Sequence, residues 1–455
     1  MSSTKPTFPL YGYERFFAMA PHASAKLAHV LTIRGDITVL VPLLARAVMQ
    51  TFNQHPKMRT VLLPGVSPQK AMVCQPIVDV AELTDKQLVV TWREKEEDST
   101  EWMGFVEREC QVPIDREHDW PFTFHVFADK TTQRFARIVL LSDHYMCDST
   151  SGAIVLNDLL QHAAKISSDA GATAEEKALL PSLYEHMHNT SAWLGVLTEA
   201  FSKWVLEPVF NFDHAGFTPV LPVDAATQSD FAGHAPVPAN TSRALFAKGT
   251  AACMQKALQR CEQEVVSLDG LLTAATLLAY GLTQHHGNLR SAHKISIKTD
   301  VAFDMRHVVG HDDAVGLYTT AGNLVSTASE GTVVHEGFWD LARRCDHERR
   351  ATLAGHELKL QSTYVHETLN AENVESTLQV KNCILSDATI ANTSLYMHPK
   401  EVSLTKDEKE STTLPCRVVA RVQLSPIALV CLHDLPLGRH EFQLRLDDQA
   451  NGAGR

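Results

Sequence analysis

The chain reads Leu140-Leu141-Ser142-Asp143-His144-Tyr145-Met146-Cys147-Asp148-Ser149 at the point where an apolar, strand-like segment gives way to an amphipathic, helix-like one. His144 and Asp148 form an H-x-x-x-D element in this connection. A histidine titrates near pH 6.5, so it can accept and return a proton close to neutral pH. The stretch therefore predicts a strand, a loop that presents His144, and a helix.

The same spacing has simpler interpretations. An Asp or Ser before a helix is a common N-cap, and the chain contains 23 histidines, so the spacing alone favours a solvated His144 in a capped turn. Cys147 is placed where a Cys–His nucleophile would need it, but a lone cysteine is usually a small buried hydrophobe. The pattern needs support from the rest of the chain.

Strand-like and helix-like segments alternate on both sides of this stretch. Period-2 patterns predict strands, and apolar residues on one face predict helices. The expected strands are 26–34, 61–63, 87–91, 122–127, 134–142, 293–302, 380–386 and 416–424, and the expected helices are 39–53, 151–165, 254–265, 268–282 and 338–350. This mixture indicates the α/β (α+β) class.

The length of the chain predicts two structural halves. At 455 residues it exceeds the roughly 250 to 300 at which a single hydrophobic core stops growing. Four prolines and few periodic segments occur between residues 210 and 243. We therefore expect an N-terminal half at 1–180 that carries H-x-x-x-D, a crossover at 181–245, and a C-terminal half at 246–455.

Composition excludes several classes of protein. The net charge of −12, without a Lys/Arg-rich run, excludes nucleic acid as a partner. Nine cysteines without a C-x-x-C pair favour free thiols in a reducing compartment. There is neither an apolar leader at the N-terminus nor a run of 18 apolar residues, so we expect a soluble, cytoplasmic protein without a membrane span.

Motifs for metals and nucleotides are absent. His307 and His311, and likewise His186 and His188, have spacings that occur in zinc sites, but no H-E-x-x-H accompanies them, so no metal is expected. The chain also lacks G-x-x-x-x-G-K and G-x-G-x-x-G sequences, which excludes P-loop NTPases and Rossmann dehydrogenases.

Five further stretches occur in the order found in one superfamily. They are Tyr13-Glu14-Arg15-Phe16-Phe17, Ser267-Leu268-Asp269-Gly270-Leu271-Leu272-Thr273-Ala274-Ala275, Asp304-Met305-Arg306, Val315-Gly316-Leu317-Tyr318 and Phe338-Trp339-Asp340-Leu341-Ala342-Arg343. Together with H-x-x-x-D, the chain resembles the chloramphenicol acetyltransferase-like superfamily. This superfamily includes the condensation domains of peptide synthetases, alcohol O-acetyltransferases and polyketide-associated acyltransferases.

Two positions depart from the pattern of that superfamily. Its members often have a second histidine where this chain has Asp143, and simpler O-acyltransferases commonly lack that histidine. They usually have a glycine where this chain has Ser149. If that position required a positive φ, Ser149 would strain the turn and displace His144.

The resemblance implies a fold and a reaction. The fold would have two halves, each a mixed sheet flanked by helices, with a tunnel at their interface. His144 would act as general base while an alcohol, less often an amine, attacks an acyl-CoA thioester. Asp148 would face away from the substrates and pair with Arg306. Gly316, Tyr318 and Asn323 would line the tunnel.

The resemblance also sets expectations for cofactors and partners. Acyl-CoA would be a co-substrate, and no cofactor would be bound permanently. Two alternatives stay open: a condensation-type enzyme whose acyl donor is held by an acyl carrier protein, and a non-catalytic binding protein of the same fold. Two fused halves already build an interfacial site, so a monomer is expected.

Overall fold

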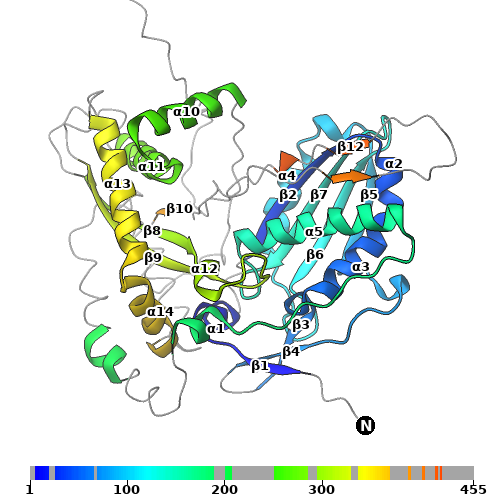
Figure 1. Ribbon diagram of the computed structural model, residues 1–455, viewed down its shortest axis with the longest axis horizontal. Helices are drawn as coiled ribbons and strands as arrows, with labels where there is room; N and C mark the ends of the chain where they lie inside the picture. The colour runs from blue at the N-terminus through cyan, green and yellow to red at the C-terminus, as the bar shows by residue number, and fades with distance from the viewer. Residues whose placement is uncertain are drawn as a thin grey trace, which may run out of the picture.

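The structure, a computed structural model, describes residues 6–19, 26–65, 69–188, 200–206, 251–284, 295–328 and 337–368, together with short strands at 388–390, 402–404, 416–418 and 421–422. These residues form two halves, each with a sheet and helices packed against it (Figure 1). The strand expected at 380–386 lies outside the described residues.

The first half is built on a five-stranded sheet. Its order is β13 (Arg421–Val422), β2 (Lys26–Arg34), β7 (Phe135–Asp143), β6 (Phe122–Asp129) and β5 (Leu88–Arg93). The β5–β6 pair is parallel and the other pairs are antiparallel, so the sheet is mixed. All nine residues of β7 are buried. The strand that leads into His144 is therefore the central strand of this sheet and is fully buried.

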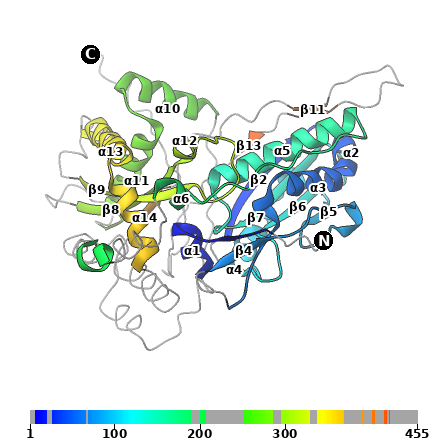
Figure 2. The ribbon, with the colours of Figure 1, turned by 60° about the horizontal axis from the view of Figure 1, so that its bottom comes forward.

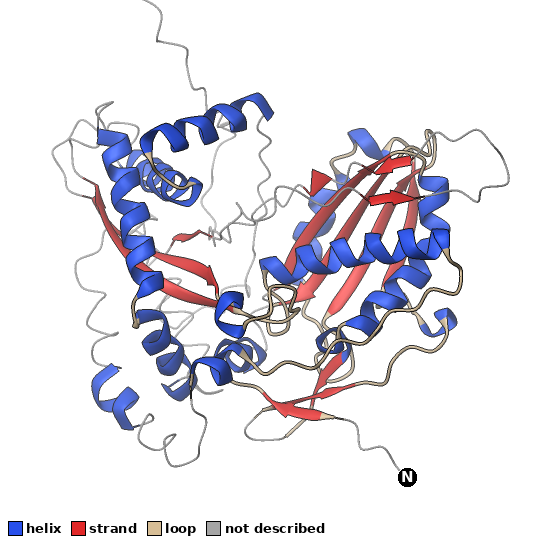
Figure 3. Cartoon of the chain, in the orientation of Figure 1, coloured by secondary structure: helices blue, strands red, loops and turns tan. Residues whose placement is uncertain are grey.

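Helices cover both faces of this sheet (Figure 3). On one face lie α3 (Leu44–Gln54) and α5 (Ser149–Ser168), and on the other lies α4 (Glu101–Gln111). The helix expected at 39–53 is divided into α2 (Ile37–Leu40), the 3-10 turn η1 (Val41–Leu43) and α3. Pro42 lies in η1 and lacks a backbone N–H, which accounts for the interruption.

A small sheet and short turns complete the first half. The sheet has the order β1 (Thr7–Pro9), β4 (Lys70–Val73) and β3 (Thr60–Leu62). The first half also contains α1 (Gly12–Met19) and the 3-10 turns η2 (Pro56–Arg59), η3 (Val80–Glu82) and η4 (Glu96–Asp98). Helix α6 (Leu183–Met187) follows an irregular segment and packs against α1 and α12 (Arg306–Val309). Helix α1 contains the stretch Tyr13–Phe17, which resembles the superfamily.

The second half has a three-stranded sheet with the order β10 (Ala388–Ile390), β8 (Ile295–Asp304) and β9 (Thr319–Ala328). The helices of this half are α10 (Ala251–Glu264), α11 (Leu268–Gln284), α12 (Arg306–Val309), α13 (Gly337–Ala354) and α14 (Glu357–Thr368). Residues 315–318, one of the five stretches that resemble the superfamily, precede β9 as a loop. Backbone pairing with β8 begins only at Thr319.

Segments far apart in the sequence cross between the halves. Helix α1 lies beside α14, as both views show (Figure 2). Strand β13 pairs with β2, and β11 (Val402–Leu404), which pairs with β12 (Cys416–Val418), lies against α5. The π-helical turn η5 (Ser202–Leu206) contacts α14. Among the described helices, none combines the length and apolar character needed to cross a bilayer.

Candidate active site

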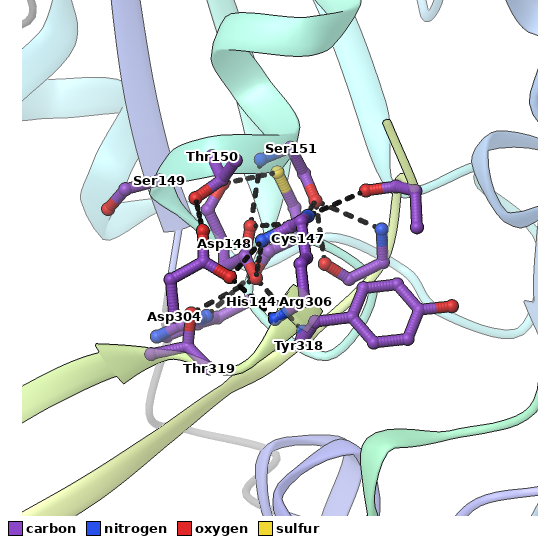
Figure 4. Close-up of polar contacts among 12 residues, drawn as sticks. His144, Cys147, Asp148, Ser149, Thr150, Ser151, Asp304, Arg306, Tyr318 and Thr319 are labelled. Atoms are coloured by element: carbon purple, nitrogen blue, oxygen red, sulfur yellow. Dashed lines mark hydrogen bonds and ion pairs between the residues drawn. The ribbon is translucent and has the colours of Figure 1, made fainter. Parts of the chain in front are cut away.

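His144 lies in the turn between β7 and α5. Strand β7 ends at Asp143, and Asp148 is the N-cap of α5, where its Oδ1 accepts a hydrogen bond of 2.8 Å from the Ser151 N–H. The end of β8, the start of α12 and the start of β9 approach this turn from the second half (Figure 4). The H-x-x-x-D turn is therefore placed where the two halves meet.

Two contacts fix the ring of His144. Its Nδ1 lies 2.8 Å from the carbonyl oxygen of Cys147, and its face stacks on Phe17 with ring centroids 4.1 Å apart. A carbonyl oxygen can only accept, so Nδ1 carries the proton. In the neutral ring Nε2 then has a free lone pair, and among the described residues it has no hydrogen-bond partner. Nε2 is thus the atom that can accept a proton.

The surroundings favour the neutral imidazole. Burial lowers the pKa of His144 below its usual value of 6.5. The Cys147 carbonyl and the carboxylates of Asp148 and Asp143 act in the opposite direction without cancelling the effect of burial. The ring is therefore uncharged and available as a base at neutral pH.

Asp148 and Arg306 form a buried ion pair between the halves. The Arg306 guanidinium donates at 2.8 Å to Oδ1 and at 3.1 Å to Oδ2, and the two side chains are 1% and 4% exposed. Oδ2 also accepts from the Tyr318 N–H at 2.9 Å and from the Thr319 hydroxyl at 3.0 Å. None of these hydrogen bonds involves His144. The structure brings Asp148 and Arg306 together and turns the carboxylate away from the His144 ring.

The carboxylate of Asp148 stays ionised despite its burial. Burial by itself raises the pKa of this carboxyl, but Arg306 and the hydrogen bonds from Ser151 and Tyr318 lower the pKa below its usual range. The charges of Asp148 and Arg306 therefore compensate each other inside the protein.

The first turn of α5 makes further contacts with the second half. The Ser151 hydroxyl donates to the Gly316 carbonyl at 2.6 Å and accepts from the Gly316 N–H at 2.9 Å. The Thr150 hydroxyl donates to Asp304 at 2.5 Å. We call these contacts, together with the Asp148–Arg306 pair, the seam. The residues that follow His144 thus connect the halves directly.

The three residues expected to line a tunnel have different positions. Gly316 lies in the seam, and a Cβ there would be 2.8 Å from the Tyr318 ring and 3.0 Å from the Lys57 side chain. The ring of Tyr318 is fully buried and turns away from Asp148 (Figure 4). Nζ of Lys57 lies 4.8 Å from the centroid of this ring. Asn323 lies in β9 opposite Asp300, with its side chain outside the described part of the chain. Their role in a tunnel stays a prediction.

A cavity of about 660 Å³ lies beside the seam. The end of α3, the later turns of α5, residues 173–180 and the loop 311–315 surround it, and Lys57 and Tyr318 also contribute to its wall. Its volume suits a small molecule. His144 is not among its lining residues, so the cavity is separate from the proton-accepting atom.

The two departures from the superfamily pattern are accommodated locally. Asp143 is 2% exposed and pairs with Arg116, whose Nε and second terminal nitrogen lie 2.7 and 3.1 Å from its two oxygens. Ser149 begins α5 and is not among the described residues with positive φ. The strain that a serine would suffer at a glycine-type position is therefore absent.

The alternatives to a histidine base are disfavoured. Cys147 is fully buried, and burial raises the pKa of its thiol, so the thiolate needed for nucleophilic attack does not form near neutral pH. His144 contacts the carbonyl of Cys147 rather than its sulfur. Within the described ranges, no three His, Cys, Asp or Glu side chains are grouped so that they could hold a metal ion.

Two contacts of the site escaped the sequence analysis. Phe17 belongs to a stretch that was noted only for its resemblance to the superfamily, and Arg116 lies in an irregular loop without periodicity. A single ion pair between residues 27 positions apart, such as Arg116 and Asp143, leaves no recognisable pattern in one sequence.

Comparison with known proteins adds a family. The profile of the family described as alcohol acetyltransferase matches residues 75–398, which is more than half of the chain. No individually curated protein matches the sequence.

Several solved structures share the fold. The first condensation domain of the calcium-dependent antibiotic synthetase has a TM-score of 0.59 and 14% identity, with 92% of this chain and 85% of that chain covered. The epimerization domain from the third module of tyrocidine synthetase B has a TM-score of 0.51 and 13% identity over 80% of this chain and 77% of that one. Polyketide synthase associated protein 5 from Mycobacterium tuberculosis has a TM-score of 0.50 and 14% identity over 87% and 85%. At these identities the similarity establishes the fold alone.

Proposed function

The chain belongs to the alcohol acetyltransferase family, in agreement with the resemblance seen in its sequence, and from this premise we propose that it transfers an acyl group from acyl-CoA to an alcohol with His144 as general base. The two-half α/β fold of condensation domains is the scaffold. Acyl transfer in general follows from membership of the family. The thioester donor and the role of His144 are the proposal.

The observation that supports His144 as base is its hydrogen bond to Cys147. This bond keeps the proton on Nδ1 and leaves the Nε2 lone pair free. The stacked Phe17 ring restricts rotation of the imidazole, so Nε2 keeps one direction. A base held in this way needs no reorganisation when the substrate arrives.

In the proposed reaction the alcohol oxygen attacks the thioester carbonyl carbon while Nε2 of His144 takes the hydroxyl proton. The carbon–sulfur bond of the tetrahedral intermediate then breaks. The departing CoA thiolate receives the proton from Nε2, which restores the neutral ring. The products are an ester and free CoA thiol, and no acyl-enzyme forms. Asp148 does not exchange protons, because it stays ionised and paired with Arg306.

A thiol-release assay tests the proposal. Purified protein would receive acetyl-CoA or longer acyl-CoAs with a panel of alcohols and amines, and free CoA thiol would be measured. We expect acceptor-dependent release that falls at least about 100-fold in His144→Ala, since a positioned base contributes on the order of 10²- to 10⁴-fold. His118→Ala is the matched control, because His118 is exposed, and it should keep full activity.

Two results would contradict the proposal. Release that is unchanged in His144→Ala would remove His144 from the chemistry. Release that occurs only from an acyl carrier protein, and never from acyl-CoA, would replace the proposed donor by the one that condensation-type enzymes use.

A further inference from the structure

A second histidine lies beneath the H-x-x-x-D turn. His29, on β2, is 4% exposed, and its Nε2 lies 3.1 Å from the carbonyl oxygen of Ser149. Because a carbonyl oxygen only accepts, Nε2 carries the proton and donates it. The other ring nitrogen, Nδ1, is buried and has no partner in the part of the chain that the structure describes. Burial lowers the pKa of His29 to about 4, so the ring is neutral at pH 7.

The helix above His29 has a glycine at the point of contact. A Cβ at Gly152 would lie 2.2 to 2.3 Å from three atoms of the His29 ring, a separation that no real side chain adopts. Glycine inside a helix costs about 1 kcal/mol relative to alanine, so this position sacrifices helix stability. The absence of a side chain at Gly152 lets the imidazole lie directly against the first turn of α5.

The two histidines hold consecutive parts of one short segment. His144 Nδ1 donates to the Cys147 carbonyl, and His29 Nε2 donates to the Ser149 carbonyl. Asp148 lies between these two carbonyls, with its side chain tied to Arg306. The carbonyl that fixes the tautomer of His144 is therefore two residues from the carbonyl that His29 holds.

We propose that His29 is a positioning residue for His144, acting through its hydrogen bond to the Ser149 carbonyl and its contact with Gly152. His29 holds the segment 147–149, and this segment presents the Cys147 carbonyl to His144. The orientation of Nε2 of His144 thus depends on a side chain from the neighbouring strand β2. The catalytic consequence rests on the proposed function, whereas the effect on the His144 ring does not.

Two substitutions separate the hydrogen bond from the volume. His29→Gln retains a donor at a similar distance from the backbone, and His29→Leu fills the space without a donor. We expect His29→Leu to lower kcat by about 10- to 100-fold with the KM for acyl-CoA nearly unchanged, since a displacement of about 1 Å at a reacting atom can cost about 100-fold. His29→Gln should stay within about threefold of the wild type in kcat.

The tautomer of the His144 ring can be measured independently of catalysis. Nitrogen-15 NMR of histidine-labelled protein distinguishes the two neutral tautomers, and the His144 signal is assigned by its loss in His144→Ala. We expect a proton on Nδ1 in the wild type and in His29→Gln, and a mixture of tautomers in His29→Leu. A wild type that transfers no acyl group but shows this pattern would refute the proposed function and support the positioning role.

A third variant guards against loss of folding. Gly152→Ala keeps His29 but displaces its ring, so it should reproduce the mixed tautomers of His144. Adding His29→Ala should relieve the clash, so the double variant should melt at a higher temperature than Gly152→Ala alone. The positioning role is refuted if His29→Leu keeps the kcat and the His144 signal of the wild type. It is also refuted if His29→Gln and His29→Leu are equally impaired.

Discussion

At the scale of single residues, one backbone carbonyl decides which atom of His144 can act. The hydrogen bond to Cys147 assigns the proton to Nδ1, and burial keeps the ring neutral. A histidine placed in the same turn without that bond would divide its population between two tautomers. In the proposed reaction, the loop backbone therefore matters as much as the imidazole.

The lowered pKa of His144 predicts the pH dependence of the reaction. Only the neutral ring accepts a proton, and its pKa lies below 6.5. The kcat/KM for the alcohol should therefore be constant around pH 7 to 8 and fall on the acid side with a midpoint below 6.5. The measurement is a pH–rate profile of thiol release. A midpoint clearly above 6.5 would contradict this assignment of the base.

The Asp148–Arg306 pair predicts a large loss of stability when one partner is removed. Arg306→Met leaves the buried carboxylate of Asp148 without its main cation, so we expect a loss of about 3 to 5 kcal/mol in the free energy of unfolding. Arg343→Met is the control, because Arg343 forms only exposed ion pairs, and its loss should be below about 1 kcal/mol. Denaturant unfolding measures both. Equal stabilities of the two variants would contradict the buried role of Arg306.

The sequence identified some of these residues and missed others for a physical reason. His144 and Asp148 belong to one short motif and Arg306 to another, and the residues of each motif are close together in the sequence. Phe17, His29 and Arg116 reach the same turn from separate elements, so their relation to it arises only after the sheet has formed. A tertiary contact of this kind leaves no period or spacing in one sequence.

At the scale of elements, α5 packs within the first half and also contacts the second half. Its stripe of apolar residues packs on the sheet of the first half, and its first turn binds the second half through Thr150 and Ser151. The apolar stripe was predicted from helical periodicity, which reports burial against the same half. The polar contacts of the first turn carry no periodic signal, so the seam was not predicted beyond the Asp148–Arg306 pair.

The seam predicts an effect for Ser151 that its neighbour should not share. Ser151→Ala removes a hydroxyl that donates to the Gly316 carbonyl and accepts hydrogen bonds from the Gly316 N–H and Arg306. Buried groups left without partners cost about 1 to 3 kcal/mol, so thermal unfolding should begin at a lower temperature. Ser149→Ala, at a half-exposed position, should have little effect. If both variants melt like the wild type, Ser151 does not hold the halves together.

Other elements differ from the sequence prediction at their boundaries. The helix expected from residue 39 is divided near Pro42, and the strand expected at 293–302 continues to Asp304 as β8. The strand expected at 416–424 appears as β12 and β13, and β13 joins the sheet of the first half. Local patterns predicted that these elements exist. Which strand pairs with which depends on contacts between distant parts of the chain, so the sequence of one strand does not predict its partner.

At the scale of the whole molecule, the two halves are joined by buried polar groups. The seam is one such region, and beside it Nζ of Lys57, from the first half, lies 4.8 Å from the centroid of the Tyr318 ring, from the second half. Within the first half Lys57 also pairs with Glu14 at 2.8 Å, and the two residues are 3% and 2% exposed. Polar contacts of this kind specify one orientation of the halves, because each donor has a defined acceptor. Two-half organisation was predicted from length and resemblance, but these contacts were not.

Buried histidines predict that the fold as a whole is sensitive to acid. Burial lowers the pKa of His29, His125, His162 and His188 to about 4 and that of His366 to about 3. In the unfolded chain these rings titrate near 6.5, so below that pH the unfolded state binds protons that the folded state does not. Stability is then complete above pH 6.5 and falls as the pH decreases towards 4.

Calorimetry between pH 7.5 and 5.5 isolates this effect, because carboxylates titrate mostly below that range. We expect the Tm to fall steadily over these two units, and to fall less in His162→Gln, which removes one buried ring but keeps a polar side chain. The exposed His118→Gln should leave the slope unchanged, because its ring reaches solvent in the folded state. A Tm that is constant from pH 7.5 to 5.5 would mean that the buried histidines take up protons in the folded protein, which would also weaken the case for a neutral His144.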